Sequence, residues 1–167
     1  VEQWFEASVA ASLRVDFMGP LSWFLGIYFA WFPSSGDTHL SVHLSQEAYL
    51  RNLLERFDMT TCRSAPTPYR SGLVYDRITP DGADLSPLAH ATIITAYQSL
   101  IGALNWLAIS TRPDLSVAVT LLAQYNSTAT PAHLLGAKYV LRYLSGSLDH
   151  GIAFTSQSAS SYLSTTY

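Results

Sequence analysis

The sequence is poor in charge: only 13% of its 167 residues are charged, about half of the usual quarter. Nine Lys and Arg stand against twelve Asp and Glu, which gives a net charge of -3. Avid binding to nucleic acid needs a surplus of Lys and Arg to neutralise phosphates, so any such contact must be local or supplied by neighbouring chain. Because 49% of the residues are hydrophobic, the chain can bury a core. Its sparse polar surface suggests a piece that packs against more protein.

Cysteine is almost absent, and several other signals are missing. The single Cys62 excludes an internal disulfide and any cysteine-based zinc site, and it fits a reducing, intracellular compartment. Residues 1–4 (VEQW) show neither an initiator Met nor a signal peptide, as expected of an excised or truncated segment. The longest apolar run, 93–109, contains Gln98 and Asn105 and is expected to be too short to span a bilayer. We therefore expect a soluble chain with no membrane partner.

The sequence also lacks a catalytic constellation. Its acids are scattered, with no Asp-Asp or Asp-x-Asp pair to hold the metal ions of phosphoryl transfer. Asp81 and Asp84 are the closest Asp pair, and we interpret them as solvated turn residues. There is no Gly-x-Ser-x-Gly elbow and no glycine-rich phosphate loop. His39 and His43 would share one face of a strand, either as metal ligands or as an exposed pair. The prediction is no catalytic residue, no metal and no cofactor in this chain.

The N-terminal part predicts a helix and then a β-hairpin. Residues 4–13 indicate a weak helix. An aromatic run at 21–32 and an extended run at 39–44 flank the turn cluster PSSGD of residues 33–37. The two runs are expected to form an antiparallel hairpin over residues 23–44.

The remainder predicts mainly helices. Ser45 is a candidate N-cap for a helix at 46–57, whose apolar side chains fall on one face. Residues 58–90, with four prolines and two glycines, predict a long irregular connector. Further helices are expected at 91–109, 113–125 and 131–144, with Pro113 and Pro131 in their first turns, and a short strand at 151–154. The outline is α+β: one antiparallel hairpin on a mainly helical body.

Several short motifs occur in a fixed order along the chain. They are residues 17–27 (FMGPLSWFLGI), residues 44–59 (LSQEAYLRNLLERFDM) followed by Cys62 and Pro66-Thr67-Pro68, residues 97–104 (YQSLIGAL), residues 111–114 (TRPD) and residues 133–147 (HLLGAKYVLRYLSGS). Each motif alone is weakly specific. Together, with their spacing, they resemble the reverse transcriptase of copia-type retrotransposon polyproteins from about residue 15 to residue 154.

The resemblance implies a place in the polymerase. Residues 1–44 would be the end of the palm with a primer-grip-like hairpin, and residues 45–154 a helical thumb and connection region. Residues 155–167 would be a flexible tail leading towards a ribonuclease H domain. The catalytic aromatic-x-Asp-Asp motif would precede Val1, so Mg²⁺ is expected only in the full-length polymerase. The implied partners are primer–template nucleic acid, bound weakly by this chain alone, and the missing palm, fingers and ribonuclease H segments, in a cytoplasmic virus-like particle or in the nucleus.

The same resemblance implies a set of nucleic-acid-binding residues. They are Trp23, Phe24, Leu25, Gly26, Lys138 and Arg142. In the grip hairpin, Gly26 would allow close approach to the sugar–phosphate chain, while Trp23 and Phe24 are expected in the core, with base stacking as the alternative. Lys138 and Arg142, four residues apart on a predicted helix, would share a solvent face that contacts phosphates, or be ordinary solvated charges.

Three positions depart from the family pattern. Tyr28 stands where Glu is usual, Gln98 where Arg is usual, and Pro20 replaces an acidic or small residue. Loss of the Arg weakens a nucleic-acid clamp and fits a decayed element as well as an active one. The sequence therefore leaves two readings open: a non-catalytic polymerase segment that positions the duplex, and a domesticated or decayed remnant acting as an interaction or structural module. A standalone enzyme is the third and weakest, because no site can be assembled.

Overall fold

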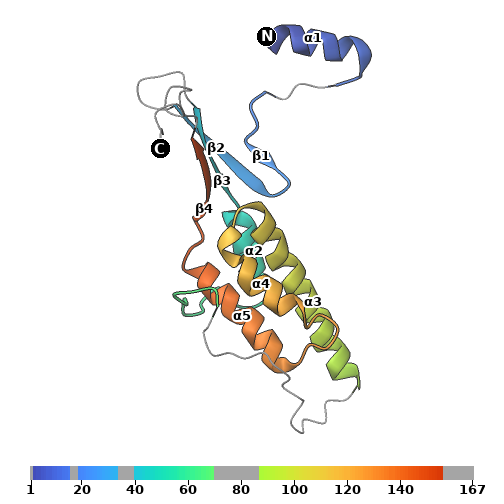
Figure 1. Cartoon of the computed structure of the whole chain (residues 1–167), viewed down its shortest axis with the longest axis vertical. Helices are drawn as coiled ribbons and strands as arrows, with labels where there is room; N and C mark the ends of the chain where they lie inside the picture. The colour runs from blue at the N-terminus through green and yellow to red at the C-terminus, as the bar shows by residue number, and fades with distance from the viewer. Residues whose placement is uncertain (1, 16–18, 34–39, 70–86, 156–167) are drawn as a thin grey trace, which may run out of the picture.

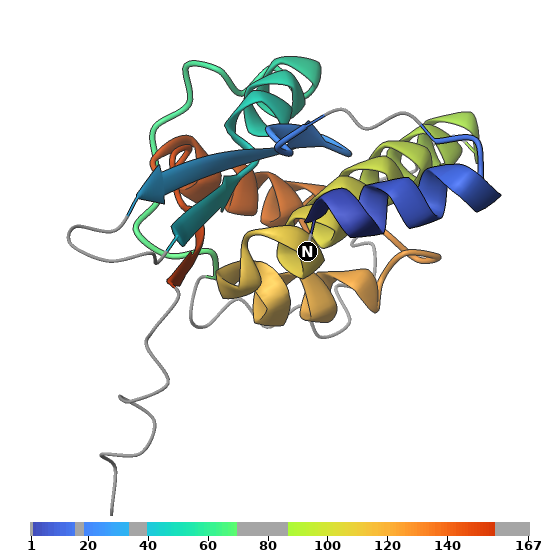
Figure 2. The same cartoon turned by 90° about the horizontal axis from the view of Figure 1, so that it is seen from above.

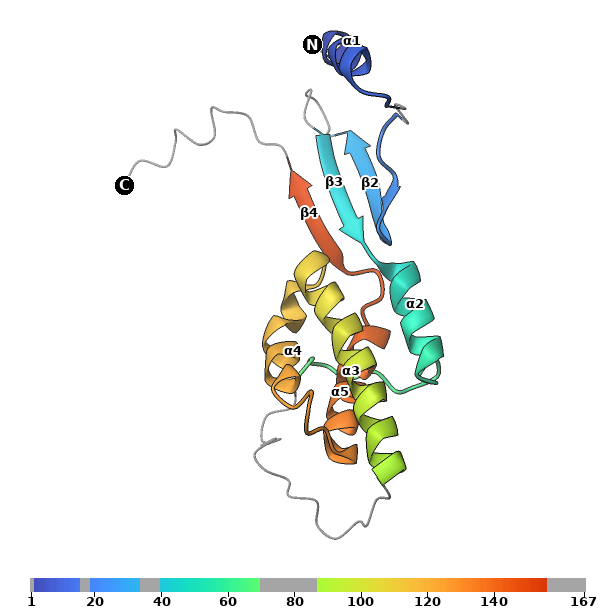
Figure 3. The ribbon, with the colours of Figure 1, turned by 90° about the vertical axis from the view of Figure 1, so that its right-hand side faces the viewer.

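A computed structural model describes residues 2–15, 19–33, 40–69 and 87–155 of the chain (Figure 1). The elements in chain order are α1 (Glu2–Ser12), β1 (Trp23–Phe24), β2 (Ile27–Pro33), β3 (Leu40–Ser45), α2 (Glu47–Arg56), α3 (Pro87–Ser110), the 3-10 helix η1 (Pro113–Leu115), α4 (Ser116–Ala123), α5 (Pro131–Ser145) and β4 (Gly151–Thr155). The strands form a sheet that projects from a body of helices, and α1 lies beyond the far end of that sheet (Figures 1 and 3).

The sheet is antiparallel with the strand order β1-β2-β3-β4. The predicted hairpin is confirmed as β2 and β3, which pair from Tyr28 with Ser45 to Pro33 with Leu40. The aromatic run is not one strand, however. It folds back at Leu25 and Gly26, which have φ angles of 50° and 79°, so Phe24 pairs with Ile27 across a two-residue turn. The predicted strand near residue 151 is also present, but it joins the sheet beside β3, so the hairpin is not isolated.

One face of this sheet is entirely apolar, as the alternation of side chains along paired strands requires. Its members are Phe24, Ile27, Phe29, Trp31, Val42, Leu44, Ile152 and Phe154. We call this set the apolar sheet face. The main contacts between the described elements join strands to strands and helices to helices, and no described helix lies over the apolar sheet face (Figure 3). Phe24, Trp31 and Phe154 are accordingly about half exposed, at 55%, 47% and 57%.

The core lies in the helical body instead. Helices α3, α4 and α5 pack side by side, with α2 against α5 (Figures 1 and 2). Leu50, Leu53 and Leu54 are the buried residues of α2, and they fall on the face that the apolar spacing predicted. Helix α5 begins at Pro131 with Thr130 as its N-cap, whose backbone N–H donates to Nδ1 of His133 at 3.0 Å. Both predicted helices, 46–57 and 131–144, are confirmed.

Two predicted boundaries are wrong. Ser45 is the last residue of β3, and the N-cap position of α2 is Gln46, which makes no side-chain cap. Gln46 is fully buried, and its Oε1 accepts a hydrogen bond from the hydroxyl of Thr111 at 2.8 Å, so a tertiary contact replaces the local cap. The predicted connector 58–90 is likewise too long, because α3 already begins at Pro87. A proline at a helix start lacks only an N–H that would be unpaired there.

Helix α3 is therefore longer than its predicted 19-residue span: it has 24 residues. Among the described residues, its segment Leu88–Ser110 is the one helix whose length and composition would allow it to cross a membrane. The core helix of a soluble protein passes the same test. Its side chains at Tyr97, Leu100, Leu104 and Leu107 are fully buried in the helical core. This packing supports the reading of α3 as the central helix of the body.

The predicted helix 113–125 consists of two shorter pieces. Pro113 begins the 3-10 turn η1, and the α-helical part α4 ends at Ala123. The described sheet and helices are compatible with the expected α+β class. The assignment of the sheet to a palm and of the helices to a thumb remains a proposal.

The junction of β3 and β4 predicts a steric requirement at Gly151. A Cβ atom there would overlap the carbonyl oxygen of Leu44 and come within 3.0 Å of His43 Nε2. Gly151→Ala should lower the free energy of unfolding by about 1–3 kcal/mol, the usual range for overpacking. Gly102→Ala is the matched control, because a Cβ at Gly102 in α3 meets nothing within 4 Å. Alanine there should stabilise by up to about 1 kcal/mol. Urea denaturation measures both, and an unchanged midpoint for Gly151→Ala would contradict the β3–β4 register.

Candidate nucleic-acid interface

The tip of the β1–β2 hairpin carries four of the six predicted contact residues. Trp23, Phe24 and Leu25 are 51%, 55% and 66% exposed, so the expectation that Trp23 and Phe24 lie in the core is wrong. The physical reason is that β1 has only two residues and pairs with β2 alone, which leaves its side chains outside the helical core. The tip thus presents apolar surface to solvent.

The turn itself explains Gly26. With φ at 79°, this residue occupies the left-handed region that favours glycine, and a Cβ there would meet nothing within 4 Å. Leu25, with φ at 50°, is an uncommon non-glycine residue in that region. Glycine is thus required by the tightness of the turn, while the open space beside it leaves room for a ligand backbone.

The two predicted cations on α5 are both partly buried, so the expectation that both face solvent is wrong. Arg142 Nε donates to the carbonyl oxygen of Arg63 at 2.8 Å, and its guanidinium lies 5.5 Å from the ring centre of Tyr139. The backbone N–H of Ala65 donates in turn to the carbonyl oxygen of Arg142 at 3.0 Å. Arg142 therefore holds the segment after α2 against α5. Of the two cations, Lys138 makes fewer contacts with the rest of the described chain. The structure places both in the helical body, apart from the hairpin tip in the sheet (Figure 3).

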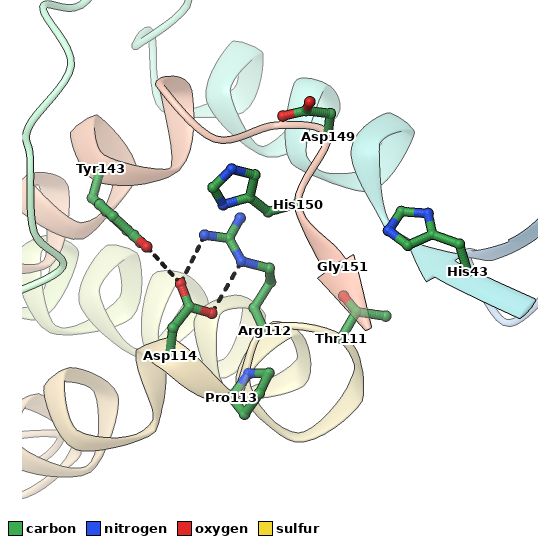
Figure 4. Close-up of a pocket in the computed structure, with 9 residues that line it drawn as sticks. All are labelled: His43, Thr111, Arg112, Pro113, Asp114, Tyr143, Asp149, His150 and Gly151. Atoms are coloured by element: carbon green, nitrogen blue, oxygen red, sulfur yellow. Dashed lines mark hydrogen bonds and ion pairs between the residues drawn. The ribbon is translucent and has the colours of Figure 1, made fainter. Parts of the chain in front are cut away.

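A polar network centred on Arg112 lies between the helices and the sheet. Arg112 is 2% exposed, and its Nε and Nη2 donate to the two carboxylate oxygens of Asp114 at 3.1 and 2.8 Å. Nη1 and Nη2 also donate to the carbonyl and hydroxyl oxygens of Ser147 at 2.8 and 2.9 Å. The Tyr143 hydroxyl donates to Asp114 at 2.8 Å (Figure 4). Arg112 and Asp114 are two residues apart, whereas Tyr143 and Ser147 come from about 30 residues further along the chain.

These contacts shift two pKa values. Burial alone would raise the pKa of Asp114, but hydrogen bonds from Arg112 and Tyr143, with the charge of Arg112, outweigh it and hold the pKa below the ordinary 3.8. Burial and the hydrogen bond to Asp114 raise the pKa of Tyr143 above the ordinary 10.0. The ionised carboxylate and the neutral phenol are thus the stable forms at neutral pH.

A cavity of about 500 Å³ opens beside this network (Figure 4). Its lining comes from β3, η1, α5 and the start of β4: His43, Thr111, Arg112, Pro113, Asp114, Tyr143, Asp149, His150 and Gly151. No group of three His, Cys, Asp or Glu residues in the described part of the chain is arranged to bind a metal ion. His39, Asp81 and Asp84 lie outside the described residues.

Comparison with known proteins identifies the class of protein. The chain is 38% identical over 79% of its length to the Retrovirus-related Pol polyprotein from transposon RE2 of Arabidopsis thaliana. It is 26% identical over 89% of its length to the corresponding polyprotein from transposon TNT 1-94 of Nicotiana tabacum. The mitochondrial protein AtMg00810 of Arabidopsis thaliana is 33% identical over 86% of the chain. No protein-family model and no solved structure matches.

These relatives define the chain as a segment of a transposon polyprotein. The relatives are retrovirus-related Pol polyproteins of transposons, which confirms the resemblance to a retrotransposon polyprotein that the motifs indicate. The chain spans 8% of the length of the RE2 polyprotein and 53% of that of the mitochondrial protein. The activity, substrates and partners of the whole polyprotein are therefore proposals for this segment.

The Arg112 network predicts a pH-dependent contribution to stability. Asp114→Asn should cost about 2 kcal/mol at neutral pH, because a hydrogen bond between charged groups becomes a weaker one. The folded-state pKa of Asp114 is depressed, so its contribution is present above the ordinary value of 3.8 and is lost as the pH falls through the lowered pKa. The unfolding free energies of the wild type and Asp114→Asn should hence converge below about pH 4. Urea denaturation across that range is the measurement.

Asp149→Asn is the matched control for this prediction. Asp149 lines the same cavity and makes no ion pair with the described residues. Its substitution should change stability by less than about 0.5 kcal/mol at neutral pH. If the difference in unfolding free energy between the wild type and Asp114→Asn stays constant down to low pH, the carboxylate charge is not what stabilises the network.

Proposed function

We propose that this segment is a non-catalytic part of an RNA-directed DNA polymerase and that it positions primer–template duplex in the full-length protein. The observation that carries the proposal is the β1–β2 hairpin, which holds the Phe24-Leu25-Gly26 sequence in a tight turn at an exposed tip. A glycine turn at a projecting tip is suited to close approach to a sugar–phosphate backbone. In this proposal the hairpin is the primer grip at the end of the palm, and the helical body is the thumb and connection.

Phosphate contacts from the helical body would be few. Arg112 and Arg51 are paired with acids, and Arg142 is bonded to the carbonyl oxygen of Arg63. At a net charge of -3, no global field attracts a polyanion to the chain. In this proposal the duplex is held mainly by the palm and fingers of the full-length protein, and Lys138 and the Nη groups of Arg142 add two local phosphate contacts.

A second function is favoured by one specific observation, the uncovered apolar sheet face. Elements of a domain normally bury such a face against another layer. A domesticated remnant acting as a protein-interaction or structural module would use this face and would need no phosphate contact. The two proposals differ in salt dependence, because phosphate binding weakens with salt, whereas an apolar interface does not.

The first proposal predicts that the 167-residue chain does not extend a primed template with Mg²⁺ or Mn²⁺. Two-metal phosphoryl transfer needs carboxylates that converge on the ions, and the described residues offer no such group. Primer extension on a labelled template is the measurement. Metal-dependent extension that copurifies with the chain, and survives controls for contaminating polymerase, would contradict a non-catalytic role.

Weak, salt-dependent duplex binding is the second expectation. Two phosphate contacts imply a slope of about -2 in log affinity against log salt on B-form DNA. Lys138→Ala should make that slope shallower by about 1 and leave α5 intact, because alanine favours helix. Arg142→Ala should also remove about one contact, but it should lower the melting temperature as well, since it breaks the bond to Arg63.

Arg56→Ala is the matched control, because it removes an exposed cation from α2 rather than from α5. It should leave the slope unchanged. An equal loss of slope for Arg56 and Lys138 would mean diffuse attraction and no α5 contact. Duplex binding whose affinity does not change with salt concentration would favour the interaction-module proposal.

A further inference from the structure

A second cavity lies where the sheet meets α2, on the sheet face opposite the apolar one. It has a volume of about 230 Å³ and is lined by Trp23, Tyr28, Ser45, Glu47, Ala48 and Arg51. We call it the Trp23–Tyr28 slot. Trp23 and Tyr28 are paired across β1 and β2, so their side chains stand on the same face of the sheet. Their ring centres are 6.0 Å apart with the planes tilted by 46°.

The aromatic walls of this slot are open to solvent. Trp23 is 51% exposed and Tyr28 46% exposed, although each has an aromatic ring that water solvates poorly. The pairing of β1 with β2 places the two rings side by side, and Arg51 is hydrogen-bonded along α2 to Glu47 at 2.6 and 3.0 Å. A ligand would thus meet two aromatic rings beside a polar rim.

The two charged side chains at the rim of the slot narrow the class of ligand that it can bind. The carboxylate of Glu47 would suit a cation in an aromatic cage, but the guanidinium of Arg51 lies 2.6 Å from it and cancels its charge. The same pairing removes Arg51 as a free phosphate ligand. What remains is a neutral slot with two π faces and, at its rim, both a hydrogen-bond donor and an acceptor. A planar, uncharged ring with polar edges fits that description.

We propose that the Trp23–Tyr28 slot binds an unpaired nucleobase, which stacks on Trp23 and Tyr28 and meets Arg51 and Glu47 with its polar edge. Stacking of a base on an aromatic side chain tolerates any sequence and contributes about 1–3 kcal/mol. The inference rests on the proposed function in that both involve nucleic acid. It differs in its chemistry, since the slot recognises a base and the proposed grip contacts the sugar–phosphate backbone.

The test compares two single strands with the same phosphates. One is a short oligoadenylate, and the other has the same backbone with abasic sites in place of the adenines. The full chain should bind the oligoadenylate about 5- to 150-fold more tightly, as one stacked base contributing about 1–3 kcal/mol implies. Binding should also quench tryptophan fluorescence, and Trp23→Ala should abolish both the quenching and the preference. Trp23→Phe should keep most of the preference because it keeps a stacking ring.

Two further variants separate the slot from other surfaces. Ala48→Phe fills the slot without removing either wall, and it should lower oligoadenylate binding about as much as Trp23→Ala. Phe154→Ala is the matched control, because Phe154 is an aromatic residue 57% exposed on the opposite face of the sheet, and it should leave binding unchanged. Circular dichroism before and after heating checks that each variant folds.

Each outcome decides between the proposals. Equal binding of the two strands overturns the nucleobase slot, while a salt-dependent duplex slope lost in Lys138→Ala would still support the proposed function. A base preference that survives both Trp23→Ala and Ala48→Phe also overturns the slot. Binding of neither strand overturns it as well.

Discussion

The arrangement of sheet and helices depends on the buried guanidinium of Arg112. It joins the 3-10 turn η1 to the end of α5 through Asp114 and Tyr143, and it reaches the loop before β4 through Ser147. β4 pairs with β3, and β3 leads directly into α2. The chain passes between the sheet and the helical body twice, from β3 to α2 and from α5 to β4, and both connections therefore lie beside this network. Because a buried charge without partners costs several kcal/mol, the loss of these partners would destabilise the junction.

Three arginines in the described part of the chain have partners within it, and this bears on what its surface can bind. Arg51, Arg112 and Arg142 are engaged by Glu47, Asp114 and the Arg63 carbonyl, although the chain has only nine Lys and Arg in total. With a net charge of -3 the chain attracts phosphates weakly, whereas aromatic side chains are plentiful and exposed on the sheet. Contacts through rings and apolar surface are hence better supported by this chain than contacts through charge.

The apolar sheet face is a surface that another layer of protein would normally bury. The apolar sheet face has no described helix over it, and the chain spans 8% of the RE2 polyprotein. Exposing such a face to water lowers the stability of the folded chain, because each exposed apolar side chain lacks the free energy that burial would contribute. The remaining polyprotein is the nearest source of a covering layer in our proposal.

The sequence by itself determined the elements whose causes are local. The apolar spacing of 46–57, the prolines at 113 and 131 and the turn cluster at 33–37 act within a few residues, and the corresponding helices and hairpin are present. The family was also readable, because its motifs are short stretches in a fixed order. Only the tertiary structure decided the exposure of Trp23, the place of β4 in the sheet and the bond from Arg142 to Arg63. These depend on contacts between residues far apart in the chain, 79 positions in the last case, which no local pattern encodes.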